Sequence, residues 1–303
     1  MISLKLSVII PTLNRPVELL NMIHSLAEQS RLPDELIIID QSIAPDSMLA
    51  ITDIIKSLNC VHLKYIHDVK IKSLVDAKHA SLKYCTGNVV CFLEDDVYLN
   101  LHYLREIEAG FNQNINMIGC CGIVTNHPVS TRIYKFIFHL FHIGIFKDLR
   151  INYFNNNINF DNSLIKSNCI SGGVSAWKID IFKYVSFDVK NKFHMLEDIE
   201  FSTRVAFFYA DSLFINPNAK LQHFSSPIGR DNLLAQKRRK TRECITFFKK
   251  RIHWKNSHIS IFWLLIGNFF ESILQSLQFF SLDPISGFIL GIKDGVSQKI
   301  IGE

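Results

Sequence analysis

Three consecutive carboxylates follow a short apolar run in the first third of the sequence. The run Asn88 to Leu93 comes after Gly87 and is typical of a buried strand, and Glu94, Asp95 and Asp96 follow it directly. Three anions this close repel one another unless a cation lies among them. Carboxylate oxygens suit a hard divalent ion such as Mg²⁺ or Mn²⁺. The residues alone leave two interpretations open, a metal site and a solvated acidic turn without an ion.

A second group of acids, Glu197 and Asp198, begins a predicted helix with an apolar face. Acids in a first helical turn can simply complement the helix dipole, but two adjacent acids also keep a chemical role open. Upstream of them, Gly172 and Gly173 permit a tight turn or the close approach of a ligand, and Trp177 could stack on a ring. The alternative is a turn that leads into a strand with Trp177 in the core.

The elements that would position these residues alternate along the chain. Pro11 is expected to end the first strand, Asn14 to cap the first helix and Pro16 to occupy its first turn. The alternation implies a parallel sheet with both faces covered, in which ligands bind beyond the carboxyl ends of the strands. Strands are predicted at residues 4–10, 36–39, 61–66, 88–93 and 117–124, and helices at residues 17–29, 46–58, 74–84 and 102–111.

Residues 130–160 interrupt this pattern, because they are rich in Phe and Asn. Two interpretations stay open for them. They form either an inserted loop with short helices, mobile or facing a membrane, or a buried hairpin of helices.

The composition is that of a protein with a substantial core. Of 303 residues, 48% are hydrophobic and 20% are charged, which excludes wholesale disorder. The length allows one large α/β domain with a tail or two small domains. The seven cysteines lack CxxC pairs, and Met1 runs almost directly into a strand without a signal-peptide pattern. A reducing, cytoplasmic compartment is therefore expected.

The last quarter of the sequence changes character. Residues 237–255 carry nine Lys or Arg against a single acid, Glu243, and apolar segments follow at residues 259–270 and 273–282. No nucleic-acid-binding motif accompanies the cations, so nucleic acid is not expected as a partner. The apolar length could cross a bilayer, but the polar interruptions favour a helix on an anionic membrane surface, contacted through residues 237–282. Packing on the protein or in a homo-oligomer ranks second, and true spanning third.

With these pieces in place, the sequence resembles glycosyltransferase family 2. The resemblance runs from Leu4 to about Phe224 and is carried by five segments in the family's order: LSVIIPTLNRP, LIIIDQS, VVCFLEDDV, ISGG with the following Trp, and MLEDIEFSTR. It implies the GT-A fold, a Rossmann-like, mostly parallel α/β sheet flanked by helices, here with a helical C-terminal extension. The implied domains are residues 1–228, with a nucleotide-binding half at 1–100 and an acceptor half at 101–228, and a C-terminal region at 229–303.

The resemblance also implies a donor site for a nucleoside-diphosphate sugar, with UDP or dTDP as the usual nucleotide. Asp96 is implied to hold the Mn²⁺ or Mg²⁺ that bridges the donor diphosphate, and His223 lies where related enzymes place a metal- or phosphate-binding His. Asp40 is implied to contact the nucleobase or ribose, and Glu94 or Asp95 to face the ribose. The implied donor-binding residues are Pro11, Thr12, Asn14, Arg15, Asp40, Lys78, Glu94 and Asp95.

The catalytic base implied by the resemblance is Asp198, the second acid of the pair that begins with Glu197. It would deprotonate the acceptor hydroxyl for a single displacement that inverts the anomeric configuration. The sequence departs from the family where Ala77-Lys78-His79 replaces a common Ala-Arg-Asn, although Lys78 could still meet a phosphate as a point charge. A second departure is Gln41, where a second Asp is common.

The acceptor is expected to be a glycan or a lipid-linked saccharide in surface polysaccharide synthesis, with Gly172, Gly173 and Trp177 among the residues that bind it. Such an enzyme is expected on the cytoplasmic side, peripherally associated with the inner face of the cell membrane. A phosphate-loop NTPase is excluded because no GxxxxGK[ST] occurs. The remaining alternative is a catalytically inactive homologue that binds nucleotide sugars or acts as a membrane scaffold.

Overall fold

The structure is a computed structural model that describes residues 4–58, 61–127, 131–146, 148, 163–191, 193–226 and 232–301. The described residues form two compact units. Apart from the gaps just given, the first unit comprises residues up to 127 together with 163–187 and 201–226. The second comprises residues 131–148, 188–200 and 232–301.

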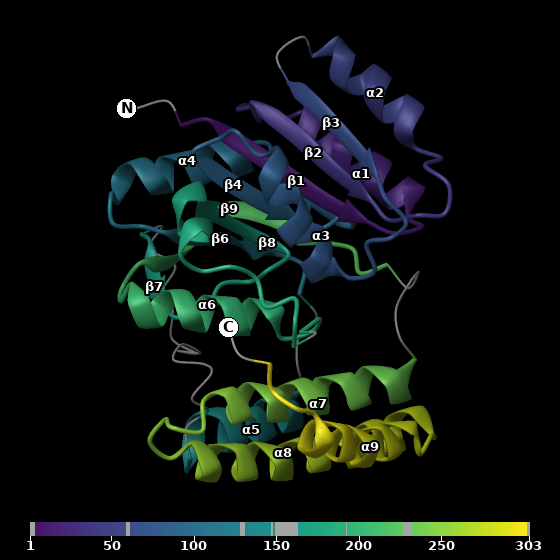
Figure 1. Ribbon diagram of the computed structural model, residues 1–303, viewed down its shortest axis with the longest axis vertical. Coiled ribbons are helices and arrows are strands. Elements are labelled where there is room, and N and C mark those ends of the chain that lie inside the picture. Colours follow the sequence, from purple (N-terminus) through teal and green to yellow (C-terminus); the bar gives the residue numbers. More distant parts are fainter. Residues whose placement is uncertain are drawn as a thin grey trace. The chain divides into compact units, whose positions relative to one another are not determined.

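One sheet forms the centre of the first unit (Figure 1). Its order is β3-β2-β1-β4-β8-β6-β9-β5, and β7 pairs with β9. Six of these strands run in one direction, and β5, β7 and β8 run in the other. The mostly parallel α/β fold expected from the sequence is therefore confirmed. The strands are β1 (Leu6–Thr12), β2 (Glu35–Asp40), β3 (His62–His67), β4 (Val89–Leu93), β5 (Val97–Leu99), β6 (Gly119–Val124), β7 (Ile165–Ser167), β8 (Val174–Lys178) and β9 (Leu213–His223).

Helices cover both faces of this sheet, because the side chains of each strand alternate between the faces. Leu6, Val8 and Ile10 of β1 join one apolar cluster with residues of α1, α2 and α4. On the other face, Phe92 of β4 meets Phe187 edge-to-face with ring centroids 5.5 Å apart. The helical segments of this unit are α1 (Pro16–Ala27), α2 (Met48–Ser57), α3 (Leu74–Ser81), η1 (Leu82–Tyr84), α4 (Tyr103–Gln113), η3 (Ile179–Lys183) and the later part of α6 (Glu197–Phe208).

Two expectations about the first turn are wrong in detail. Strand β1 continues through Pro11, which pairs with Ile39. This is possible because the β1–β4 ladder ends at the Ile9–Phe92 pair, so no β4 residue requires the missing N–H of Pro11. Asn14 has a left-handed φ of 54° and precedes the helix N-cap, which is Arg15 and makes no side-chain cap. Pro16 occupies the first turn of α1 as predicted.

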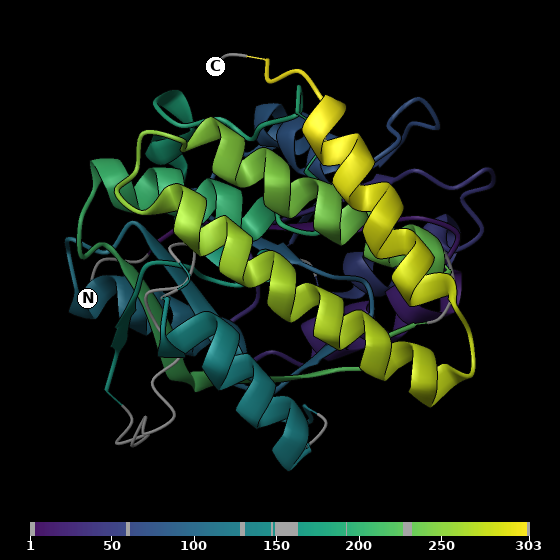
Figure 2. The same ribbon diagram turned by 90° about the horizontal axis from the view of Figure 1, so that it is seen from below.

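Helices make up most of the second unit, and α7, α8 and α9 lie side by side in Figure 2 (green to yellow). Glycines of α9 allow close contact with α7. A Cβ on Gly287 would lie 2.4 Å from Leu234 O, and one on Gly291 would lie 2.6 Å from Arg238 O. The helices are α5 (Arg132–Phe138), the π-helix η2 (His139–Gly144), α7 (Leu233–Lys250), α8 (Ser257–Phe279) and α9 (Asp283–Ser297), together with the start of α6.

The segment 130–160 contributes α5 and η2 to the second unit, and residues 130, 147 and 149–160 of it lie outside the described part. Phe141 of η2 is buried, and its ring lies tilted against that of Trp263 of α8, with ring centroids 4.9 Å apart. The described helices therefore pack within their unit, although Phe136 and Ile145 remain exposed. The units also group residues 188–200 with the C-terminal helices, whereas the domain boundary expected from the sequence lies at 228/229.

Most of the cations of the 237–255 stretch have acidic partners within the second unit. Lys237 and Lys240 lie 2.8 and 3.3 Å from Glu271, and Arg238 lies 2.6 Å from Asp294. These side chains belong to the contacts between α7, α8 and α9. By length and composition alone, helix α8 could nevertheless cross a membrane. Its most apolar stretch of 18 residues has a mean hydropathy of 1.3, and 33% of that stretch is buried.

Candidate active site

The register of the sheet brings the predicted acids and the first turn together at one edge. Because Ile9 pairs with Phe92, Thr12 at the end of β1 comes level with Asp95 beyond the end of β4. Strand β5 begins directly after Asp96 and pairs antiparallel with β9, so that Val97 lies opposite His223. Residues far apart in the sequence therefore meet beyond the carboxyl ends of β1 and β4, as the position of ligand sites in such sheets predicts.

Glu94, Asp96 and His223 converge on one point. Nε2 of His223 lies 3.1 Å from Oε2 of Glu94 and 3.0 Å from Oδ1 of Asp96, and the three potential ligand atoms all lie within 4.8 Å of one another. Although these distances are short, Nε2 of His223 and Oδ1 of Asp96 are buried atoms that make no regular hydrogen bond among the described residues. Two carboxylate oxygens and an imidazole nitrogen in this arrangement fit Mn²⁺ or Mg²⁺, and the imidazole favours Mn²⁺.

The charges in this group support a cation site. Close contact with Asp96, and then with Glu94, raises the pKa of His223 to about 10 despite its burial. Burial alone would raise the pKa of Asp96, but His223 and the backbone N–H of Ser226, 2.9 Å away, hold it below its ordinary value. Asp96 is therefore favoured in its ionised form, and a protonated imidazole supplies a positive charge where a metal ion would.

Asp95 turns away from this group toward β1. Its Oδ2 accepts a hydrogen bond of 2.7 Å from the hydroxyl of Thr12, and its Oδ1 lies 2.9 Å from Nη1 of Arg15. The same Arg15 nitrogen lies 3.5 Å from Asp96. Burial raises the pKa of Asp95 to about 6 even with these partners. Thus Glu94 rather than Asp95 lies with Asp96 and His223 at the candidate metal site, and Arg15 bridges Asp95 and Asp96.

Asp40 ends β2 level with Thr12 and faces the protein rather than an open surface. It is 2% exposed, its Oδ2 accepts a hydrogen bond of 2.6 Å from the Tyr65 hydroxyl, and its Oδ1 accepts one of 2.9 Å from Ser42 N–H. Ser42 in turn accepts a hydrogen bond of 2.7 Å from Asn14 N–H. Asp40 and Asn14 thus fix the two turns beside the acids, and a contact of Asp40 with a nucleobase or ribose stays a prediction.

The Gly172-Gly173 turn lies against the acids. Glu94 N–H donates to Gly173 O at 2.9 Å, and a Cβ on Gly173 would lie 2.1 Å from Oε1 of Glu94. Lys78 is buried, with Nζ 3.0 Å from Gly172 O and 5.6 Å from the centre of the Phe92 ring. The glycines and Lys78 therefore pack beside Glu94. The predicted contacts of the glycines with the acceptor and of Lys78 with a phosphate remain predictions.

Trp177 occupies the core, which is the alternative left open by its sequence context. It is 2% exposed on β8, its Nε1 donates to Ser175 Oγ at 2.9 Å, and its ring meets that of Phe201 edge-to-face. In this position it holds β8 against α6, and a bound sugar has no access to its ring.

Glu197 and Asp198 are the first two residues of α6 and belong to the second unit. Glu197 is 7% exposed and Asp198 is half-buried. Oδ1 of Asp198 accepts a hydrogen bond of 2.8 Å from Ile199 N–H. Helix α6 therefore begins with the predicted acids, as the sequence indicates.

Sequence reasoning missed one contact of this site. Ser226 lies beyond β9, donates its N–H to Asp96, and directs its hydroxyl to Glu18 of α1 at 2.7 Å. Nothing in the residue types around Ser226 signals this, because the contact depends on the course of the chain after β9.

This fold, with an acidic group beyond its fourth strand, is that of the GT-A glycosyltransferases. The chain belongs to glycosyl transferase family 2, whose sequence model matches residues 7–175, more than half of its length. It is therefore a glycosyltransferase by family and fold. A search of curated proteins gave no match.

Solved structures with this fold include a mannosyltransferase from Pyrobaculum calidifontis in complex with GDP-Man and Mn²⁺. It is 11% identical, with a TM-score of 0.62 over 98% of this chain and 88% of the other. TarS from S. aureus is 16% identical, with a TM-score of 0.61 over 96% of this chain and 80% of the other. TarS in complex with UDP-GlcNAc is 15% identical, with a TM-score of 0.58 over the same shares. At these identities the likeness shows the fold.

Proposed function

We propose that the chain is an inverting glycosyltransferase that moves a sugar from a nucleoside-diphosphate sugar to a hydroxyl of a glycan or lipid-linked acceptor in surface polysaccharide synthesis. The observation that carries this proposal is the convergence of Glu94, Asp96 and His223 on one point in a member of family 2. The neighbours in complex with GDP-Man and UDP-GlcNAc support a nucleotide-sugar donor. UDP and dTDP donors remain the first choices.

At the donor end, Glu94, Asp96 and His223 would hold a divalent ion. When bound, that ion supplies Lewis-acid neutralisation of the charge on the departing diphosphate. Arg15, whose guanidinium lies beside Asp95 and Asp96, would donate hydrogen bonds to a diphosphate oxygen. The first turn of α1 follows directly, so its backbone N–H groups add to the positive field at this edge.

At the acceptor end, Asp198 is the base of the proposal. Its carboxylate takes the proton of the acceptor hydroxyl while the acceptor oxygen forms a bond to the anomeric carbon. The bond between that carbon and the diphosphate oxygen breaks on the opposite face, and the nucleoside diphosphate leaves with the electron pair. One displacement of this kind inverts the anomeric configuration.

Thermal stability with a panel of nucleoside diphosphates tests the donor site. UDP, dTDP and GDP are compared with and without Mn²⁺, for the wild type and Asp96→Ala. A ligand at about a hundred times its Kd stabilises the folded state by about 2.7 kcal/mol, which gives a measurable shift. We expect one nucleotide to raise the midpoint only when Mn²⁺ and Asp96 are both present. A wild type that responds to none of them would support an inactive scaffold instead.

We also propose a cytoplasmic enzyme that associates peripherally with the inner face of the cell membrane through its second unit. The support is an apolar surface rather than the cations of the 237–255 stretch, most of which are paired within the unit. On and after α8, Phe262 is 66% exposed, Leu277 67% and Phe280 97%. Rings and aliphatic side chains on one helix are typical of interfacial helices.

Sedimentation with lipid vesicles tests this association. We expect the wild type to sediment with vesicles of mixed neutral and anionic lipid, and Phe262→Asp with Leu277→Asp to stay in solution. Phe207→Asp in α6 is the control, since Phe207 is 70% exposed in the first unit. Equal sedimentation of the double variant and the control would exclude α8 as the contact.

A further inference from the structure

Helix α6, which carries the proposed base, has an apolar residue at its N-cap position. Its first helical hydrogen bond runs from Glu200 N–H to Leu196 O, so Leu196 stands at the N-cap and has no side-chain acceptor. Glu243 of α7 supplies the acceptor instead. Its Oε2 accepts hydrogen bonds from Met195 N–H at 2.8 Å and from Leu196 N–H at 3.0 Å. The backbone that leads into the first turn of α6 is therefore held by the C-terminal helical region.

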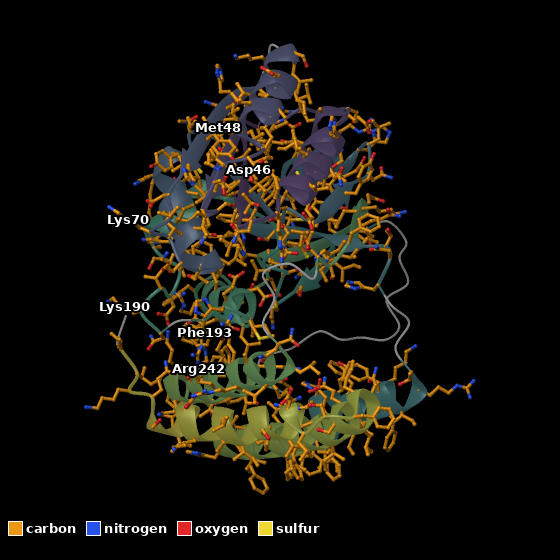
Figure 3. The ribbon with its side chains drawn as sticks, turned by 90° about the vertical axis from the view of Figure 1, so that its right-hand side faces the viewer. Asp46, Met48, Lys70, Lys190, Phe193 and Arg242 are labelled. Carbon is orange, nitrogen blue, oxygen red and sulfur yellow. The ribbon has the colours of Figure 1, made fainter. Side chains whose placement is uncertain are left out.

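Glu243 has the properties of a fixed group. It is 1% exposed, and its Oε1 lies 3.1 Å from Nη2 of Arg242. A carboxylate at a helix N-terminus is also favoured by the helix dipole. Figure 3 labels Arg242 on α7 and Phe193 on the segment before α6, both of which belong to the second unit.

A second contact ties the next turn of α6 to the end of α7. Oε1 of Glu200 lies 3.1 Å from Nζ of Lys250 and 3.3 Å from Nη2 of Arg251. Glu200 is 1% exposed and Arg251 is 5% exposed, so this ion pair is shielded from water. The Arg251 guanidinium also lies 4.0 Å from the centre of the Phe247 ring.

An apolar cluster joins the same two segments. Phe193 and Leu196, before α6, pack with residues of α7 and α8, and Ile199 of α6 packs against the cluster at its margin. The α7 and α8 members are Cys244, Phe247, Phe248 and Leu264.

These contacts fix one side of α6 and leave Asp198 on the other. At 100° per residue, Leu196, Ile199 and Glu200 share one face of the helix, and all three contact the second unit's helices. Asp198 lies about 160° around the axis from both Leu196 and Glu200. The position of the first turn of α6, and with it the direction of the Asp198 side chain, therefore depends on α7 as well as on the later turns, where Phe201 packs against Trp177.

We propose that Glu243 is a positioning residue for the transfer reaction, which acts by holding the start of α6 so that Asp198 is aimed at the acceptor hydroxyl. The inference rests on the proposed function, in which Asp198 is the base. It assigns to the C-terminal helical region a part in the chemistry in addition to any membrane contact. Glu243 itself touches neither substrate nor reacting atoms.

Two substitutions of Glu243 and one matched control test this role. Glu243→Leu removes the acceptor, whereas Glu243→Gln keeps one oxygen that can accept the same N–H groups. The control is Glu271→Leu, which removes another largely buried acid paired with α7, on α8 and away from α6. Hydrogen exchange of the Met195 and Leu196 amides reports the cap. Release of nucleoside diphosphate from UDP-GlcNAc and GDP-Man with Mn²⁺ gives kcat and KM, and the nucleotide-induced thermal shift reports donor binding.

We expect Glu243→Leu to speed exchange of the two amides and to lower kcat about tenfold to a hundredfold, because small errors of alignment have effects of that size. KM for the donor and the nucleotide-induced shift should stay as in the wild type. Glu243→Gln should recover most of kcat. Glu271→Leu should lower the thermal midpoint with kcat unchanged.

Three outcomes would overturn the inference. The first is wild-type kcat in Glu243→Leu although the amides exchange faster. The second is a loss in Glu243→Gln equal to that in Glu243→Leu. The third is an equal fall of kcat in Glu271→Leu, which would indicate general loss of packing. A wild type that releases no nucleoside diphosphate from any donor it binds would instead overturn the proposed function, and the inference with it.

Discussion

Buried carboxylates occur in both units, and the two sets differ in what neutralises them. In the second unit, Glu200 and Glu271 each lie within 3.3 Å of two cationic side chains from α7 or its C-cap. In the first unit, Glu94 and Asp96 converge with the imidazole of His223, and Asp96 also lies 3.5 Å from Arg15. The second-unit acids meet Lys and Arg side chains that belong to helix packing. The first-unit acids converge on one point with an imidazole nitrogen, which is an arrangement that a metal ion fits.

The pKa values express the same difference. Although burial would raise the pKa of Glu271, Lys240 and Lys237 hold it at about 2. Burial raises the pKa of Asp95 to about 6 even though Thr12 and Arg15 oppose the shift. Burial therefore outweighs the partners of Asp95 at the acidic edge, whereas the Lys partners of Glu271 outweigh its burial.

The largest effect we predict follows from Asp198→Asn. The amide cannot take the proton of the acceptor hydroxyl, so transfer should fall by about two to four orders of magnitude. The midpoint shift caused by nucleotide and Mn²⁺ should match that of the wild type, because Glu94, Asp96 and His223 are unchanged. Product formation in single-turnover assays provides the measurement. Transfer at the wild-type rate would remove Asp198 as the base and leave the donor site untouched.

A smaller effect is expected on the free energy of unfolding, and it differs between the acids of the two units. Lys250→Met removes a cation 2.5 Å from Asp188 and 3.1 Å from Glu200, and should lower the free energy of unfolding by about 3 kcal/mol, because buried charges lose a partner. Glu94→Gln removes a charge from the converging group and should leave stability without metal nearly unchanged, while the stabilisation by Mn²⁺ disappears. Urea-induced unfolding with and without Mn²⁺ measures both. If both variants lost the same free energy of unfolding without Mn²⁺, the acids of the two units would not differ in their role.

The sequence indicates the sheet and its acidic edge because both depend on local patterns. Apolar runs predict β1, β2 and β4, and the consecutive carboxylates after β4 mark the edge where Glu94 and Asp96 meet His223. Which of the three acids meet His223 and which meets Thr12 could not be predicted, because this depends on the register of the strands. Thr12 lies level with Asp95, and His223 lies opposite Val97. No single segment contains that information.

In the C-terminal region, the sequence does not reveal which cations are exposed. A run of cations looks like a surface for anions when each residue is considered alone. Its partners, Glu271 on α8, Asp294 on α9 and Glu200 on α6, are 31 or more residues away from the cations they meet and become visible only in the folded unit. Charge in the sequence therefore predicts exposure poorly where amphipathic helices pack together.

The last prediction concerns the proton that His223 carries in place of an ion. Its pKa is raised to about 10 from an ordinary value of 6.5, so its contribution to stability is fully present below about pH 6.5 and is lost as pH rises through about 10. Mn²⁺ needs the neutral imidazole, so binding at pH 8 should release about one proton, and Mn²⁺ affinity should rise with pH between 7 and 10. Calorimetric titration in two buffers of different ionisation enthalpy measures that proton. His223→Gln should bind Mn²⁺ more weakly and release none. A wild type whose Mn²⁺ affinity is flat over this range, with no proton released, would place the ion away from His223 and leave the acidic edge with an imidazolium as its permanent partner.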